Sequence, residues 1–297
     1  MSRSLETSGV EVPVAGGVLA AFRLGQRPDG APTMLAIHGI LSNSRAWLAV
    51  ARALGGRASL VALDLRGRGR SNELPPPYGI DVHVEDALAT LDALGLEQAV
   101  LAGHSLGAYI AANVAVSHPG RVRAVVLVDG GLAIPGTEHL DPQAATASLL
   151  GPALARLKMT FETREKYHEW WRGHPAFAGG AIADHDLVAF ADHDLVGAAP
   201  PLRPGISEAA VRADAAGLRE AAEAAPRLDA PATLLVAPRG LLDDPNPMQP
   251  LAVARAWAEQ RPAQRHLIAV PDVNHYTITM GAQGAAAVAD AIAGYCG

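Results

Sequence analysis

Five residues, Gly103-His104-Ser105-Leu106-Gly107, limit what this chain can fold into more than any other stretch. They follow an apolar run over residues 98–102 and precede an Ala-rich segment over residues 108–117. This order predicts a strand, a sharp turn and a helix, because small residues beside the serine let the chain turn tightly and let the helix pack close behind. Ser105 would then lie between the carboxyl end of a strand and the amino end of a helix, where developing negative charge is stabilised. That position suits a nucleophile.

Strand and helix patterns alternate on both sides of this turn. Compact apolar runs predict strands, and longer segments with helical spacing lie between them. The predicted strands cover residues 10–14, 17–24, 33–37, 60–63, 98–102, 124–128, 232–237 and 265–270, and the predicted helices cover 47–54, 82–94, 108–117, 251–260 and 284–293. Such alternation indicates a mostly parallel sheet with helices on both faces.

The alternation breaks between residues 132 and 228. This segment is rich in proline, contains helical pieces such as Gln143–Leu157 and Thr163–Trp171, and shows no convincing strand. Long insertions in such a domain are usually functional and lie over the active-site end. We therefore predict an α/β core from residues 1–131 and 229–297, with a helical cap over residues 132–228 inserted after the sixth strand.

The composition indicates in which compartment the protein works and which kinds of partner it does not bind. The net charge of −6 and a pI near 6.0 argue against a nucleic-acid or anionic-membrane partner. The one dense basic cluster, Arg66, Arg68 and Arg70, is expected to be a solvated loop. A single cysteine, Cys296, allows no internal disulfide, the N-terminus lacks the pattern of a signal peptide, and no window reaches the ~18 apolar residues of a membrane span. A soluble, cytoplasmic protein is the expectation.

Several motifs in a fixed order carry a family resemblance. His38-Gly39-Ile40 follows one predicted strand, the Arg- and Gly-rich stretch 64–71 follows the next, and then come Gly103–Gly107, a strand ending at Asp129, and a late loop ending at His275. In this order and spacing the chain resembles the capped, serine-dependent α/β-hydrolases. The resemblance spans about residues 10–295, although no motif falls within the predicted cap.

The resemblance implies a catalytic triad. Ser105 would be the nucleophile and His275 the general base, since a serine hydroxyl needs an adjacent base and the histidine follows the nucleophile in the chain in this fold. Most family members place the acid in the loop after the strand at 233–237, and Asp243 matches that spacing because Pro247 follows it by four residues. Asp244 and Asp129 remain alternatives. The acid would fix the imidazole tautomer and stabilise the imidazolium.

The oxyanion hole is expected to use backbone N–H groups. Leu106, directly after the serine, would supply one donor, and Ile40 the other, with Leu41 as the alternative. Neither a cofactor nor a metal is implied. His104 neighbours the nucleophile, and its side chain is expected to point away from that side of the turn.

The predicted cap contains one repeat. The sequence Ala-Asp-His-Asp-Leu-Val occurs at residues 183–188 and again at 191–196. Because no known ligand spacing is matched, we interpret the repeat as a local duplication rather than a metal site. The aromatic residues Trp170, Trp171, Phe177 and Phe190 would pack the cap onto the core, with an apolar acyl pocket as the alternative.

Together these features favour a serine hydrolase that cleaves carboxylic esters through an acyl-enzyme. The expected partner is a small, apolar, ester-like substrate. Lactonases, thioesterases and C–C bond hydrolases share the same triad, because the pocket sets the substrate. A ligand-binding protein on the same fold is the less favoured alternative. The oligomeric state does not follow from the sequence.

Overall fold

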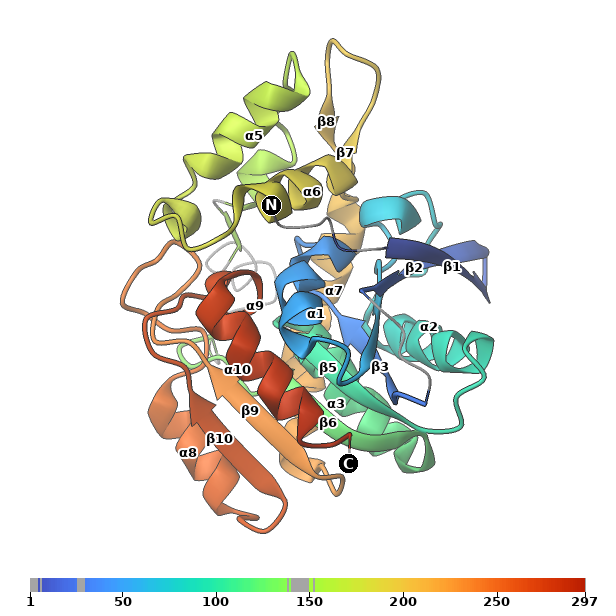
Figure 1. Ribbon diagram of the computed structural model, residues 1–297, viewed down its shortest axis with the longest axis vertical. Coiled ribbons are helices and arrows are strands. Elements are labelled where there is room, and N and C mark those ends of the chain that lie inside the picture. The colour runs from blue at the N-terminus through green and yellow to red at the C-terminus, as the bar shows by residue number, and fades with distance from the viewer. Residues whose placement is uncertain are drawn as a thin grey trace.

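An eight-stranded mixed sheet forms the centre of the computed structural model (Figure 1), which describes residues 5, 7–25, 30–137, 139, 150–151 and 153–296. The strand order is β1-β2-β4-β3-β5-β6-β9-β10. Six neighbouring strands, from β4 to β10 in that order, run parallel, and the β1–β2 hairpin joins antiparallel at one edge. The bounds are Thr7–Val14 for β1, Gly17–Leu24 for β2, Thr33–Ile37 for β3, Ser59–Leu63 for β4, Ala99–His104 for β5, Val122–Val128 for β6, Ala232–Val236 for β9 and Arg265–Ala269 for β10.

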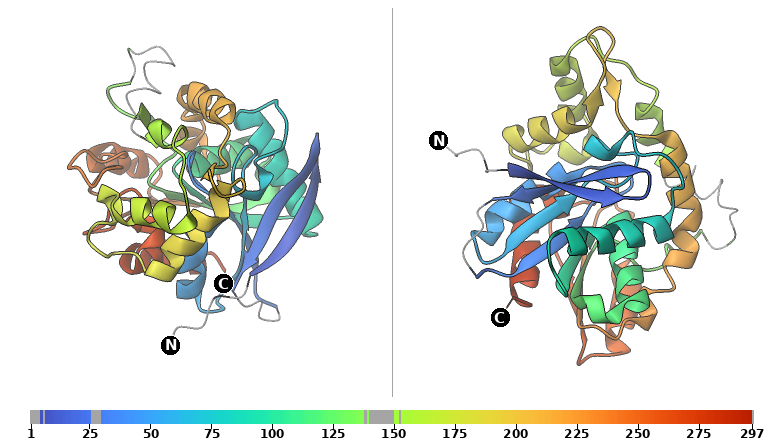
Figure 2. Two further views of the ribbon diagram at one scale, coloured as in Figure 1. Left: turned by 90° about the horizontal axis from the view of Figure 1, so that it is seen from above. Right: turned by 90° about the vertical axis from the view of Figure 1, so that its right-hand side faces the viewer.

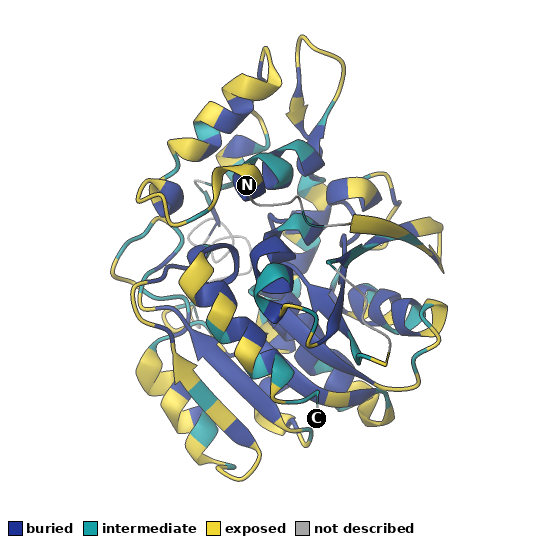
Figure 3. Ribbon diagram, viewed as in Figure 1, coloured by how far each residue is buried: buried dark blue, intermediate teal, exposed yellow. Residues whose placement is uncertain are grey.

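Helices cover both faces of this sheet. On one face α1 (Leu48–Leu54) and α10 (Ala282–Ala293) share a buried apolar cluster with the strands. On the other face the cluster is formed with α2 (Ile80–Ala93), α3 (Leu106–Ser117), α7 (Glu208–Ala221) and α8 (Leu251–Glu259). The central strands are buried while the outer helices alternate between buried and exposed residues (Figure 3). The predicted fold class, a mostly parallel sheet flanked by helices, is confirmed.

Most of the described residues between β6 and β9 lie beyond one end of the sheet (Figure 2), whereas α7 packs on its face beside α2 and α3. This inserted segment, residues 132–228, contains α5 (Arg164–Arg172), α6 (Asp184–Asp194), α7 and two short strands, β7 (Leu195–Val196) and β8 (Arg203–Pro204). The antiparallel β7–β8 pair corrects the expectation that the segment holds no strand. Of the helix expected at Gln143–Leu157, residues 150, 151 and 153–156 are helical, whereas residues 143–149 and 152 lie outside the described residues.

Short helical turns complete the chain. Five are 3₁₀ turns, η1 (Ser44–Trp47), η2 (Gly69–Ser71), η3 (Pro119–Arg121), η4 (Pro175–Phe177) and η5 (Ala225–Arg227), among the described residues. The α-helix α9 (Thr277–Met280) was not expected from the sequence and directly follows the loop that carries His275.

The basic cluster at residues 66–70 is largely buried, which corrects the prediction of a solvated loop. Arg66 donates two hydrogen bonds to Asp86, at 2.6 and 2.8 Å. Arg68 forms an ion pair with Asp214 at 2.5 Å, and both side chains are fully buried. Arg66 and Arg68 are thus paired internally with α2 and α7, whereas Arg70 is exposed.

The repeat at residues 183–196 ties the inserted segment to the core. Asp186, in the first copy, pairs with Arg52 of α1 at 2.6 Å. His193, in the second copy, hydrogen-bonds to Asp64 at 2.6 Å. Burial alone would raise the pKa of Asp64, but the hydrogen bond and charge of His193 lower it to about 2. The two copies thus serve as attachment points.

Candidate active site

Ser105 occupies the sharp turn between β5 and α3. Its backbone has φ 53° and ψ −119°, a conformation that costs free energy in a non-glycine residue. The glycines on either side permit this turn because a Cβ at Gly103 would lie 2.1 Å from the carbonyl oxygen of Gly107, and a Cβ at Gly107 would lie 2.0 Å from that of Ile37. The close packing of helix on strand therefore holds the serine at the apex of the turn.

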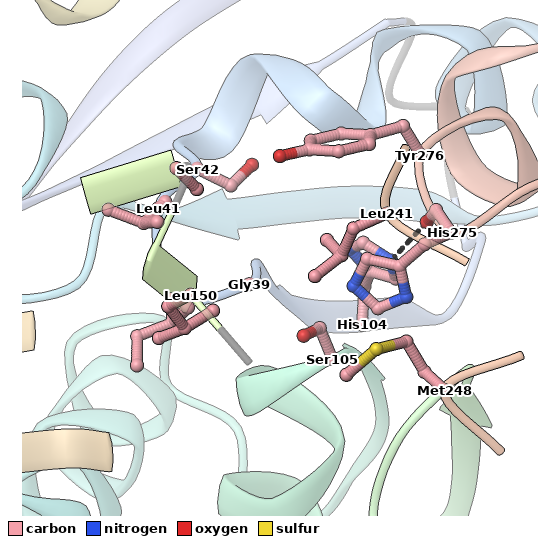
Figure 4. Close-up of a pocket in the computed structure, with 12 residues that line it drawn as sticks. Gly39, Leu41, Ser42, His104, Ser105, Leu150, Leu241, Met248, His275 and Tyr276 are labelled. Carbon is pink, nitrogen blue, oxygen red and sulfur yellow. Dashed lines mark hydrogen bonds between the residues drawn. The ribbon is translucent and has the colours of Figure 1, made fainter. Parts of the chain in front are cut away.

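His275 lies in the loop between β10 and α9 and lines the same cavity as Ser105. This cavity, which we call the histidine-side cavity, has a volume of about 40 Å³ (Figure 4). His275 is 3% exposed. No hydrogen bond joins the Ser105 hydroxyl to the imidazole among the described residues, and such contacts commonly tighten only when substrate binds.

Asp129 is the carboxylate that contacts the imidazole. The Nδ1–H of His275 donates a hydrogen bond to Oδ2 of Asp129 at 2.7 Å. The other oxygen, Oδ1, accepts a hydrogen bond from the backbone N–H of Ala237 at 3.1 Å, which fixes the carboxylate between β6 and β9. Asp129 directly follows β6 and has a positive φ of 46°. Nε2 is therefore the ring nitrogen of His275 that does not contact the carboxylate.

Asp243, favoured from the sequence, does not contact the imidazole. Its carboxylate accepts a hydrogen bond from the Asn274 side chain at 2.9 Å and pairs with Arg239 at 3.1 Å. Asp244 accepts hydrogen bonds from the backbone N–H groups of Leu242 and Asn246 within its own exposed loop. The structure thus places Asp129, an alternative in the sequence analysis, at His275 in place of Asp243 and Asp244.

Asn274 positions the loop that carries His275, and the sequence analysis did not single it out. Its Nδ2 donates to Asp243 and to the carbonyl of Ala176 in the inserted segment, both at 2.9 Å. Its Oδ1 accepts from the backbone N–H groups of Tyr276 and Thr277. Asp243 therefore supports the histidine loop through Asn274.

His104 lies against His275, contrary to the expectation that it points away. Its Nε2–H donates a hydrogen bond to the backbone carbonyl of His275 at 2.8 Å, and the two rings lie 4.7 Å apart (Figure 4). Burial, with a further contribution from the neighbouring His275, lowers the pKa of His104 well below its usual value. His104 is therefore neutral at pH 7 and adds no positive charge beside the imidazole.

The loop after β3 lies beside Ser105 because β3 and β5 are neighbours in the sheet. A Cβ at Gly39 would lie 3.1 Å from that of Ser105. Ile40 and Leu106 border a second cavity of about 30 Å³ together with Ser105, and Leu41 borders the histidine-side cavity. The loop after β3 and the start of α3 therefore both border the cavities at Ser105.

Buried side chains hold this loop through its carbonyl groups. His38 donates from Nδ1 to the carbonyl of Gly39 at 2.7 Å, and burial lowers its pKa to about 4, so the ring is neutral. Arg68 donates to the carbonyl of Ile40, and Arg156, from the inserted segment, donates to that of Leu41, both at 3.1 Å. With the carbonyls engaged, the orientation of the loop's peptide groups is set from both the core and the inserted segment.

The histidine-side cavity has mostly apolar walls. They are formed by Ile40, Leu41, Leu150, Ala153, Leu241 and Met248, with the side chains of Ser42 and Tyr276 at one end. In Figure 4 the Tyr276 hydroxyl points toward Ser42. Of the aromatic residues singled out from the sequence, Trp171, Phe177 and Phe190 belong to a buried cluster that packs the inserted segment, with Trp170 against it, and none lines this cavity.

Within the part of the chain that the structure describes, no group of three or more His, Cys, Asp or Glu side chains is arranged to hold a metal ion. The described helices also include none long and apolar enough to cross a membrane.

Comparison with known proteins identifies the family. The family model described as the alpha/beta hydrolase fold matches residues 32–185, more than half of the chain. The chain belongs to this family. Ser105 and Asp129 both lie within the α/β-hydrolase match, whereas His275 lies beyond it.

Curated relatives of this α/β-hydrolase carry several activities in their names. "Lipase LipV" of Mycobacterium tuberculosis is 36% identical over 132 residues, which is 43% of this chain and 50% of the lipase. A "2-(acetamidomethylene)succinate hydrolase" of Mesorhizobium japonicum is 30% identical over 191 residues, 63% of each chain. The alignments span half or less of the first few curated relatives.

Solved structures match along almost the whole chain. The crystal structure titled E-2-(Acetamidomethylene)succinate Hydrolase has a TM-score of 0.76 and 24% identity, covering 97% of this chain and 99% of that one. At this identity the likeness establishes the fold alone.

Proposed function

We propose that this protein is a serine hydrolase that cleaves carboxylic esters through an acyl-enzyme, with Ser105, His275 and Asp129 as its catalytic residues. The observation that carries the proposal is the 2.7 Å hydrogen bond between His275 and Asp129 beside the cavity that Ser105 lines. Serine, imidazole and carboxylate recur in this relation on several unrelated folds.

Each residue would have a defined role. The Ser105 hydroxyl attacks the acyl carbon while Nε2 of His275 takes its proton, and the imidazolium then donates that proton to the leaving alcohol. Water, deprotonated by the same histidine, cleaves the acyl-enzyme. Asp129 holds the proton on Nδ1 of His275 and stabilises the imidazolium.

The negative charge that develops on the attacked carbonyl oxygen has to be stabilised by hydrogen-bond donors. The backbone N–H groups of Leu106 and Ile40 are proposed for this role, because both residues border the cavity next to Ser105. One such donor is typically worth about 3–4 kcal/mol of transition-state stabilisation. The apolar walls of the histidine-side cavity favour a small, apolar ester over a strongly anionic one.

The proposal is tested by p-nitrophenol release from a series of p-nitrophenyl acyl esters. Ser105→Ala should abolish turnover, whereas Ser117→Ala, an exposed serine at the far end of α3, should retain it. A phosphonate that labels activated serines should react once per chain with the wild type and fail to react with Ser105→Ala. Turnover that persists in Ser105→Ala would reject the assignment.

A further inference from the structure

Two adjoining cavities border Ser105, and they differ in the polar groups that line them. The histidine-side cavity contains His275. The second cavity, which we call the Gln249 cavity, contains no His275 and is lined by Ile40, Ser105, Leu106, Tyr109, Asp129, Ile134, Leu150, Leu218, Met248 and Gln249. Its volume of about 30 Å³ suits a group of a few atoms.

The two cavities have different places in the proposed reaction, and this assignment rests on the proposed function. His275 must give a proton to the leaving alcohol, so the leaving group lies in the histidine-side cavity. The acyl part then points to the other side of Ser105, into the Gln249 cavity, whose border includes the oxyanion residues Ile40 and Leu106.

Gln249 is one of the residues that line this acyl side, and its amide group is buried. The side chain is 1% exposed, and its Nε2 donates to the carbonyl of Leu132 at 3.3 Å. Its Oε1 is buried without a hydrogen-bond partner among the described residues. Exchanging the amide oxygen and nitrogen would put two acceptors, Oε1 and the Leu132 carbonyl, against each other, so the observed orientation is the favourable one.

The other polar side chains of the cavity are already engaged. The Tyr109 hydroxyl donates to the Leu132 carbonyl at 2.7 Å. Asp129 uses its two oxygens for His275 and for the backbone of Ala237. None of these groups donates to Oε1 of Gln249. A buried acceptor without a hydrogen bond costs free energy, and a ligand that donates a hydrogen bond to it removes that cost.

We propose that Oε1 of Gln249 accepts a hydrogen bond from the acyl part of the substrate. The preferred substrate is then an ester of a short acyl group that carries an O–H or N–H donor. A plain alkyl chain of the same size leaves the oxygen unpaired and is disfavoured, since sites built to bind a donor reject analogues that lack it.

Matched p-nitrophenyl esters test this preference. Hydroxyacyl esters with one to three methylene groups are compared with alkyl esters of the same length, and with their O-methyl ethers, which keep the electron withdrawal but lose the donor. We expect kcat/KM of the wild type to favour one hydroxyacyl ester by about tenfold to a hundredfold over both partners. Gln249→Met, similar in shape but without the amide oxygen, should reduce that ratio to about threefold or less.

Met248→Leu is the matched control, because it alters the same cavity without removing an acceptor and should leave the preference in place. If the wild type shows nearly equal kcat/KM for hydroxyacyl and alkyl esters at every chain length, the inference is overturned, whether or not Gln249→Met folds. A preference that survives in Gln249→Met overturns it as well, since another group would then supply the acceptor. If esters are turned over in a Ser105-dependent way without any donor preference, this inference fails and the proposed function stands; if no ester is turned over, both fail.

Discussion

Replacing Asp129 by asparagine tests the assignment of the acid through the tautomer of His275. The backbone N–H of Ala237 needs an acceptor, so the side-chain oxygen of the new Asn would face Ala237 and its NH₂ would face Nδ1 of His275. Nδ1 would then have to accept, which moves the imidazole proton to Nε2. With a proton already on Nε2, the histidine cannot take the one from Ser105.

The expected loss in kcat is about 10⁴-fold, equivalent to about 5 kcal/mol of transition-state stabilisation. The assay is single-turnover hydrolysis of a p-nitrophenyl ester, with thermal unfolding measured in parallel. Asp243→Asn is the matched control, because Asp243 contacts Asn274 and Arg239 but not the imidazole. It should cost about tenfold or less, since the carboxylate acts only through the histidine loop.

The opposite order of the two activity losses would refute the assignment of Asp129 as the acid. If Asp243→Asn lost more than a thousandfold while Asp129→Asn kept a tenth of the activity, Asp243 would be the acid. The hydrogen bond between His275 and Asp129 would then not describe the reacting enzyme.

Three further predictions concern stability. Gly107→Ala should lower the free energy of unfolding, measured in urea, by at least about 2 kcal/mol, because the new Cβ would lie 2.0 Å from the carbonyl oxygen of Ile37. Gly120→Ala is the control, since a Cβ there would have no atom within 4 Å, and it should change the free energy of unfolding by about 0.5 kcal/mol or less. Equal effects of the two substitutions would contradict this packing. The pKa of His38 is about 4 in the folded protein and near 6.5 in the unfolded chain. The neutral ring therefore contributes about 3 kcal/mol to the free energy of unfolding above pH 6.5, and this contribution is lost as the pH falls to 4. A free energy of unfolding, measured in urea, that stays constant across this pH range would contradict the assignment. Arg156→Met should cost about 3–5 kcal/mol by leaving the buried Asp194 unpaired, and adding Asp194→Leu should recover part of that loss; no recovery would argue against the ion pair as the cause.

The core of the fold was predictable because each element carries its own signal. The central strands are compact apolar runs, and the turn at Ser105 is bounded by glycines that the close packing requires. The burial of Arg66 and Arg68 could not be read in the same way. Their partners, Asp86 and Asp214, lie on helices that only the folded chain brings near, so a local pattern of charges indicated solvent instead.

The choice of acid shows the limit of motif spacing. β6 and β9 are neighbours in the sheet, so the loops that follow them, with Asp129 and Asp243, both reach toward the loop of His275. Spacing along the chain favoured Asp243. The Asp129 carboxylate contacts His275 and is oriented by the Ala237 N–H, and this second contact depends on the register of β6 and β9, which the sequence does not display.

The buried attachments of the inserted segment limit how its specificity can be engineered. Arg156 holds a carbonyl beside the serine and pairs with Asp194 at 2.8 Å, while His193 of the same segment holds Asp64 of the core. A segment transplanted from a relative with other residues at these positions would remove the His193 hydrogen bond to the buried Asp64 and the donor to the Leu41 carbonyl. The segment and the loop beneath it therefore have to be exchanged as one piece, with both ends of each buried pair, if a grafted specificity is to keep its catalytic rate.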